Sequence, residues 1–112
     1  MKGQETKNKI LRTARTLFYE KGYRGTSCSA ISAAAGTNLG LINYYIHGKG
    51  DIAMLIYSDI RDAFDQLTAN FEPELTGARQ FLFSCALELA LCLRCDPFSR
   101  FYFELTLSLI HI

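Results

Sequence analysis

Residues 26–52 read TSCSAISAAAGTNLGLINYYIHGKGDI, and they predict two short helices joined by a glycine turn. Ser27 is the expected N-cap of the first helix, because its hydroxyl can accept a hydrogen bond from a free backbone N–H of the first turn. Ile31, Ala34 and Ala35 form the apolar side of this helix. Gly36 is expected to end it, since glycine adopts the left-handed C-cap conformation without steric cost.

The second helix follows after a turn of about three residues. Asn38 is its expected N-cap, and apolar residues recur at helical spacing at positions 41, 42, 45 and 46 until His47 and Gly48 stop it. A helix, a tight glycine turn and a second helix are the outline of a helix-turn-helix. Residues 1–50 therefore predict a three-helix unit, in which a first helix from Thr6 to Lys21, with Gly22 as its C-cap, braces the other two.

Three more helices are expected in the second half, which makes the predicted fold all-α. The fourth is expected to start at Asp51, whose negative charge suits a helix N-terminus, and to stop before Pro73. The fifth, roughly residues 76–95, is apolar on nearly every side, as in a helix buried among others. The sixth is expected to start with Asp96 as N-cap and Pro97 at the first helical position. Residues 51–106 are then expected to form about three helices of a second domain.

The charge is distributed unevenly along the 112 residues. Residues 1–50 contain eight Lys/Arg and two Asp/Glu, which gives +6, and residues 51–112 contain four and nine, which gives −5; the two sum to the net charge of +1. A basic first half predicts contact with a polyanion such as DNA, and solvated helix faces are the other interpretation. Because the sequence shows no signal peptide, no apolar run long enough for a bilayer, and four cysteines without secretory context, we expect a cytoplasmic protein without a membrane segment.

The order of residue types over residues 7–52 resembles the TetR-type repressors. The resemblance is carried by Ala14, Leu17, Phe18, Gly22, Tyr23, Thr26, Ser27, Ile31, Ala34, Ala35, Gly36, Asn38, Gly40, Ile42, Tyr45 and Lys49. Three positions depart from the pattern, since Thr37 stands where an aliphatic residue is common, Ile46 where Phe is usual and Gly50 where an acidic residue follows the lysine. The resemblance implies a sequence-specific, ligand-responsive transcriptional repressor, which is no enzyme and needs no cofactor.

The resemblance also implies which residues meet DNA. The positions that face the major groove are Asn38, Leu39, Gly40, Leu41, Asn43 and Tyr44. Asn43 is a candidate for a bidentate contact to adenine, and Gly40 would permit close approach of the backbone. The candidates for the phosphate backbone are Thr26, Ser27, Tyr45 and Lys49, of which Lys49 is the strongest, with His47 as a weaker one.

The implied partners are double-stranded DNA with a palindromic operator, an unknown small-molecule effector and, at full length, a second copy of the chain. The fourth helix is expected to couple the effector to the DNA-binding unit. Phe98, Phe101 and Tyr102 are candidates for the effector pocket, with plain core as the other interpretation. Cys92-x-x-Cys95 has no second pair and no nearby histidine, so we expect packing and no metal site, with redox sensing as the alternative.

Two further expectations concern function and the end of the chain. No catalytic triad, phosphate loop or carboxylate pair stands out, and the alternative function is a helical protein-interaction module, because there is no Lys or Arg between Asn38 and His47. Residues 107–112, LSLIHI, equal the translation of CTG TCT CTT ATA CAC ATC, a transposon end used as a sequencing adapter. We therefore expect natural sequence to stop near Thr106 and the chain to be a truncated fragment, with an ordinary apolar helix end as the other interpretation.

Overall fold

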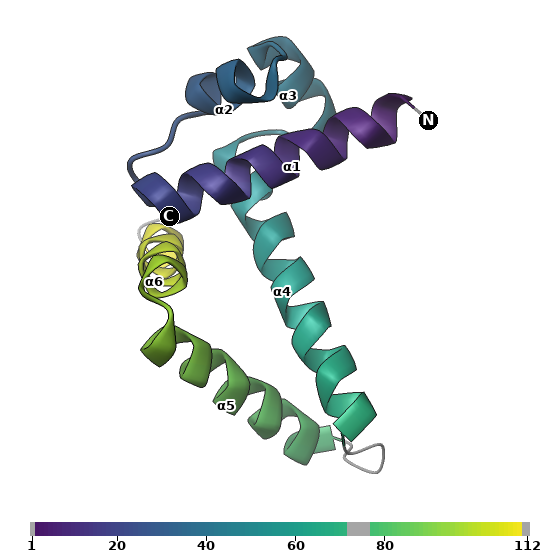
Figure 1. Ribbon diagram of the computed structural model, residues 1–112, viewed down its shortest axis with the longest axis vertical. Coiled ribbons are helices and arrows are strands. Elements are labelled where there is room, and N and C mark those ends of the chain that lie inside the picture. The colour runs from purple at the N-terminus through teal and green to yellow at the C-terminus, as the bar shows by residue number, and fades with distance from the viewer. Residues whose placement is uncertain (1, 72–76, 111–112) are drawn as a thin grey trace.

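The computed structural model describes residues 2–71 and 77–110. These residues form six α-helices and no strand, which confirms the all-α prediction. The helices are α1 (Lys2–Lys21), α2 (Cys28–Ala35), α3 (Leu39–Tyr45), α4 (Lys49–Phe71), α5 (Gly77–Arg94) and α6 (Asp96–Ile110). In Figure 1, α1 separates α2 and α3 on one side from α4 on the other. From the far end of α4 the chain returns through α5 to α6, which lies beside the C-terminal end of α1.

Local hydrogen bonds set the ends of α2 and α3 as the sequence predicts. Ser27 Oγ accepts a hydrogen bond from the backbone N–H of Ala30 at 3.1 Å, and Asn38 Oδ1 accepts one from the backbone N–H of Leu41 at 2.9 Å. Gly36 adopts the left-handed conformation, with φ of 69°. The predicted caps are therefore confirmed, and they hold α2 and α3 as two separate short helices.

A single hydrophobic core runs from the three-helix unit into the second half. Its members come from α1, α2, α3, α4 and α6, the loop after α1 and the residue after α3: Ile10, Ala14, Phe18, Tyr23, Ile31, Ala35, Ile42, Ile46, Ile52, Ala53, Ile56, Phe101 and Leu105. Burying each Ile or Phe side chain stabilises the fold by about 1.5–3 kcal/mol. Ala34, expected on the apolar side of α2, is exposed, because this helix turns Ile31, Ser32 and Ala35 inward.

Three helix starts differ from the predicted ones. Helix α1 begins at Lys2, before the expected Thr6. The first hydrogen bond of α4 runs from the backbone N–H of Ile52 to the carbonyl of Gly48 at 3.0 Å, so Gly48 is the N-cap and α4 begins at Lys49, before the expected Asp51. In α6 the carbonyl of Cys95 accepts the first bond, from the backbone N–H of Ser99 at 2.9 Å, so Asp96 lies one residue inside the helix. The differences in α4 and α6 arise because the residue whose carbonyl accepts the first backbone hydrogen bond defines the N-cap, even where its side chain is not one that favours this position.

The prediction that α5 is buried on nearly every side is wrong. Ser84 and Glu88 are its buried residues, whereas Leu82, Leu89 and Leu93 are 65%, 60% and 76% exposed. The physical reason is that α5 packs mainly against α4 and α6, which cover one of its sides. No helix within the described ranges is long and apolar enough to cross a membrane.

Parts of the sequence-based layout stay predictions. The expected helix stop at Pro73 and two residues of the expected adapter tail, His111 and Ile112, lie outside the described residues. The domain boundary at residue 50 falls within the continuous helix α4, and core residues such as Ile52 lie beyond it.

Candidate nucleic-acid interface

Helix α3 presents most of its side chains to solvent. Ile42 is its buried residue and anchors it to the core, whereas Leu39, Leu41 and Tyr44 are 42%, 38% and 78% exposed. Asn43 and Gly40 are exposed as well. All six positions expected to face the major groove, Asn38 included, are therefore accessible at one outer surface, which we call the α3 face: Asn38, Leu39, Gly40, Leu41, Asn43 and Tyr44.

The two hydroxyl residues before α2 have different surroundings. Ser27 is exposed and caps the helix, so it lies beside the free backbone N–H groups of the first turn. Thr26 is only 2% exposed, and its hydroxyl lies 2.9 Å from the carbonyl oxygen of Gly22, to which it donates, and 3.3 Å from that of Leu17. The Thr26 hydroxyl is thus bonded to backbone carbonyls and holds the loop before α2, and its expected phosphate contact stays a prediction.

Lys49 makes contacts inside the protein that the sequence did not suggest. Its Nζ donates to the backbone carbonyl of Tyr23 at 3.1 Å and lies 4.3 Å from the centroid of the Tyr23 ring. Tyr23 is buried and packs against Phe18 with ring centroids 5.4 Å apart. Lys49 therefore ties the first turn of α4 to the loop after α1, and only the remaining donors of its ammonium are available to a phosphate.

Tyr44 and Tyr45 end α3 with different exposures. Their rings meet edge to face with centroids 5.1 Å apart. Tyr45 is partly buried, and its hydroxyl lies 3.4 Å from the position that a Cβ atom would take on Gly3. The first turn of α1 thus supports the ring of Tyr45, while Tyr44 stays free at the α3 face.

The structure places one further cation, Lys9 of α1, near the helix-turn-helix. Lys9 is exposed, and its Nζ lies 3.8 Å from the position that a Cβ atom would take on Gly36. The ammonium therefore lies beside the turn between α2 and α3. Its place in the sequence gave no signal for this role, because the proximity depends on how α1 crosses α2.

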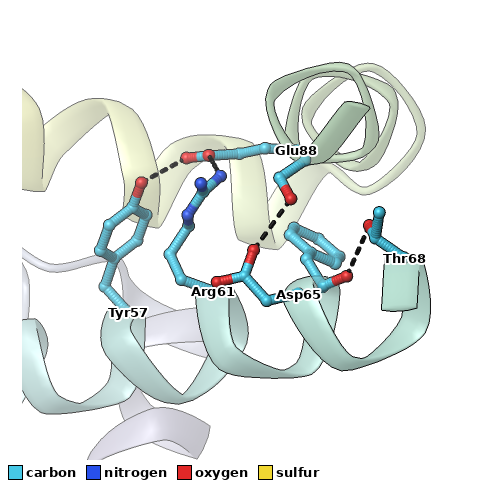
Figure 2. Close-up of polar contacts among 7 residues, drawn as sticks. Tyr57, Arg61, Asp65, Thr68 and Glu88 are labelled. Carbon is cyan, nitrogen blue, oxygen red and sulfur yellow. Dashed lines mark hydrogen bonds and ion pairs between the residues drawn. The ribbon is translucent and has the colours of Figure 1, made fainter. Parts of the chain in front are cut away.

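The second half contains a polar cluster between α4 and α5 (Figure 2). One carboxylate oxygen of Glu88 accepts a hydrogen bond from the Tyr57 hydroxyl at 2.7 Å, and the other pairs with Arg61 Nη1 at 2.7 Å. Glu88 is 7% exposed. The Ser84 hydroxyl donates to Asp65 Oδ1 at 2.9 Å one turn further along. These bonds give hydrogen-bond partners to Ser84 and Glu88, the polar residues that α5 buries. A buried charge such as that of Glu88 is stable only when it is paired in this way.

The expected effector-pocket residues divide between core and surface. Phe101 is fully buried and stacks on Phe18 with centroids 5.4 Å apart, so it belongs to the core, as the other interpretation held. Phe98 is 1% exposed and stacks on Tyr102. Tyr102 alone lines an open groove of about 190 Å³, together with Met54, Tyr57, Leu105, Thr106 and Leu109.

The cysteines are all free and partly buried. Burial raises the pKa of Cys92 above its ordinary value, and the nearby Glu88 carboxylate raises it further. A raised pKa disfavours the thiolate on which redox chemistry depends. Among the described residues, no group of three or more His, Cys, Asp or Glu could hold a metal ion.

Comparison with known proteins agrees with this geometry. The family model described as "Bacterial regulatory proteins, tetR family" matches residues 10–53. The probable HTH-type transcriptional regulator YttP of Bacillus subtilis (strain 168) is 36% identical over 61 residues, which are 54% of this chain and 30% of that protein. The HTH-type transcriptional regulator TtgR of Pseudomonas putida is 27% identical over 71 residues, which are 63% of this chain and 34% of that protein.

The matched segment thus spans about a third of the length of these curated relatives. No solved structure matches the chain significantly. The matched residues 10–53 contain α2, α3 and the turn between them, the same part that carries the caps and the α3 face. Residues 10–53 are therefore a domain of the tetR family of bacterial regulatory proteins.

Proposed function

We propose that the protein is a sequence-specific DNA-binding transcription regulator that reads the major groove with the α3 face. The observation that carries the proposal is the orientation of α3, which turns Ile42 into the core and leaves Leu39, Asn43 and Tyr44 outward. An α-helix with its side chains is about 10–12 Å in diameter, and the major groove is about 12 Å wide, so the groove admits a helix such as α3. Asn43 is a donor and acceptor suited to adenine, and the exposed leucines suit thymine methyl groups.

The phosphate contacts of this proposal come from the rim of the α3 face. Ser27 and the first turn of α2 offer backbone N–H groups, and Lys9 offers an ammonium beside the α2–α3 turn. Tyr45 and Lys49 stay in the proposed set, each with part of its side chain committed to contacts within the protein. Because α3 itself has no Lys or Arg, these rim residues supply the salt-dependent share of the affinity.

The finer parts of the proposal rest on the family. We propose that the full-length regulator is a repressor that binds a palindromic operator as a homodimer and releases it when a small effector binds the second half. A two-fold dimer reads half-sites one helical turn apart, so selected sequences are expected to show inverted repeats with that spacing. The effector would act through α4, which joins the α3 face to the polar cluster around Glu88.

The test is selection of duplexes from a random pool, followed by fluorescence-anisotropy titration of the selected sequence at 50 and 200 mM salt. Affinity should fall steeply with salt, and Asn43→Ala should change which bases are selected. Asn70→Ala is the matched control, because Asn70 is exposed on α4 far along the chain from α3. Equal selection by wild type and Asn43→Ala would remove Asn43 from the site.

The second candidate is a helical protein-interaction module that does not bind DNA. The observation that favours it is the uncharged, partly apolar character of the α3 face, where Leu39, Leu41 and Tyr44 are all exposed. The same titration separates the candidates. Absence of any binding to DNA at low salt by a dimeric form would support the interaction module and refute the proposed function.

A further inference from the structure

Helix α6 packs against the corner of the chain that leads from α1 into α2 (Figure 1). Phe101 of α6 stacks on Phe18 of α1 with centroids 5.4 Å apart and planes 20° apart, and it meets Tyr19 edge to face at 5.8 Å. Phe18 and Phe101 are both fully buried. The last turn of α1 and the middle of α6 are thus one packed unit, although about 80 residues separate them in sequence.

Arg100, next to this stack, binds the open end of α1. Its Nη2 donates to the backbone carbonyls of Tyr19 and Glu20 at 3.1 and 2.9 Å. The last four carbonyls of a helix have no partner within the helix, and they carry partial negative charge. A guanidinium at this place satisfies two of them and is attracted by the helix dipole, so α6 adds a side-chain cap to the end of α1, beside the left-handed Gly22.

Glu104, one turn further along α6, binds the loop that follows. Its Oε2 accepts a hydrogen bond from the backbone N–H of Arg24 at 2.8 Å. Its Oε1 lies 2.6 Å from the position that a Cβ atom would take on Gly22, whose φ is 82°. Only glycine at position 22 allows both the left-handed turn and this close approach of the carboxylate.

The same corner is bonded directly to the start of α2. The hydroxyl of Thr26 donates to the carbonyl of Gly22, and its backbone N–H bonds to the carbonyl of Tyr23 at 3.3 Å. Thr26 precedes Ser27, the N-cap of α2. Glu104 is therefore linked to the first turn of α2 by these hydrogen bonds together with the short backbone segment of residues 22–27.

We propose that Arg100 and Glu104 are positioning residues, and that α6 clamps the α1–α2 corner and so sets the orientation of α2 and α3. This coupling runs beside the one expected through α4, and a displacement of α6 would change the α3 face without any direct contact. The consequence for DNA rests on the proposed function, whereas the mechanical coupling does not. A contact that only packs α6 in place would affect residues 19–24 and stop there.

The test measures amide hydrogen exchange by NMR in the full chain, for wild type, Glu104→Ala, Glu104→Gln and Arg100→Ala. Glu104→Ala and Arg100→Ala should each speed exchange about tenfold at Arg24 and at the first bonded amides of α2, Ala30 and Ile31, since a hydrogen bond to a charged group is lost. Glu104→Gln keeps an acceptor oxygen and should show a smaller effect. Arg94→Ala, an exposed arginine in the last turn of α5, is the matched control and should leave these amides unchanged.

DNA affinity of the same proteins gives the second readout. Glu104→Ala should bind the selected duplex about tenfold more weakly, with Glu104→Gln in between. Exchange that changes at Arg24 but not in α2 would overturn the clamp. Faster exchange in α2 together with wild-type DNA affinity would overturn its consequence for DNA binding. If the wild type bound no DNA, the proposed function would fail, while the exchange pattern in α2 would still decide for or against the clamp.

Discussion

Replacing Thr37 by valine should stabilise the protein. Thr37 lies in the turn between α2 and α3. Its Oγ1 is buried and has no hydrogen-bond partner among the described residues. A buried polar group left unpaired costs about 1–3 kcal/mol, and valine has the same branched shape without that group. Because the whole Thr37 residue is only partly buried, we take the low end of this range, about 1 kcal/mol.

The assay is thermal unfolding followed by circular dichroism, with urea unfolding as the second measure. A gain of about 1 kcal/mol corresponds to a Tm higher by about 4–8 °C in a domain of this size. Thr16→Val is the matched control: Thr16 is exposed on α1, its hydroxyl donates to the carbonyl of Arg12, and the change should stay within about 0.5 kcal/mol. A Tm of Thr37→Val equal to or below that of wild type would show that the hydroxyl is hydrogen-bonded in solution, and would refute the reasoning.

Three other changes test the contacts of the second half and of Lys49. Lys49→Met removes the hydrogen bond to the Tyr23 carbonyl and the contact with the Tyr23 ring, so it should lower the free energy of unfolding by about 1 kcal/mol. Urea unfolding without DNA measures this, and an unchanged free energy would mean that Lys49 does not make these contacts in solution. Glu88→Ala leaves Arg61 partly buried and unpaired and should lower the free energy of unfolding by about 2–4 kcal/mol. The double change Arg61→Met with Glu88→Leu should recover at least half of that loss, and an equal loss in both proteins would contradict the ion-pair argument. Burial and the hydrogen bond to Glu88 raise the pKa of Tyr57 above its ordinary value, so above about pH 10 the unfolded chain releases a proton that the folded chain keeps, and the free energy of unfolding should fall as pH rises. Tyr57→Phe should make this fall less steep in urea unfolding between pH 8 and 11, and an unchanged fall would contradict the assignment.

Much of the three-helix unit was predictable because its signals are local. Ser27 and Asn38 bond to amides three residues further along, and Gly36 turns the chain by its own backbone freedom. The exposed positions of α3 were implied by the family resemblance, whereas helical spacing alone placed Leu41, which is exposed, with the buried Ile42. The starts of α4 and α6 were misplaced by one or two residues, since several nearby residues are acceptable caps and the sequence does not rank them.

The candidate site was predictable in its outline and not in the state of each side chain. Thr26 and Ser27 are neighbours with the same chemistry, yet one is 2% exposed and the other is at the surface. The exposure of α5 was mispredicted because periodicity reports which residues are apolar, and burial depends on whether another element covers them. Phe101 resembled a pocket residue for the same reason, and only its stacking on Phe18 places it in the core.

The sequence by itself determined the helices, the glycine turn and the caps of α2 and α3, because each depends on residues within about four positions of one another. The tertiary structure decided which polar groups are free to meet a ligand. The bond from Lys49 to Tyr23 spans 26 residues, and those from Arg100 to the end of α1 span 80 and 81. Contacts at such separations exist only after the helices have packed. The geometry of the α1–α2 corner, its contacts with α6 and the contacts of Lys49 with Tyr23 therefore come from tertiary structure.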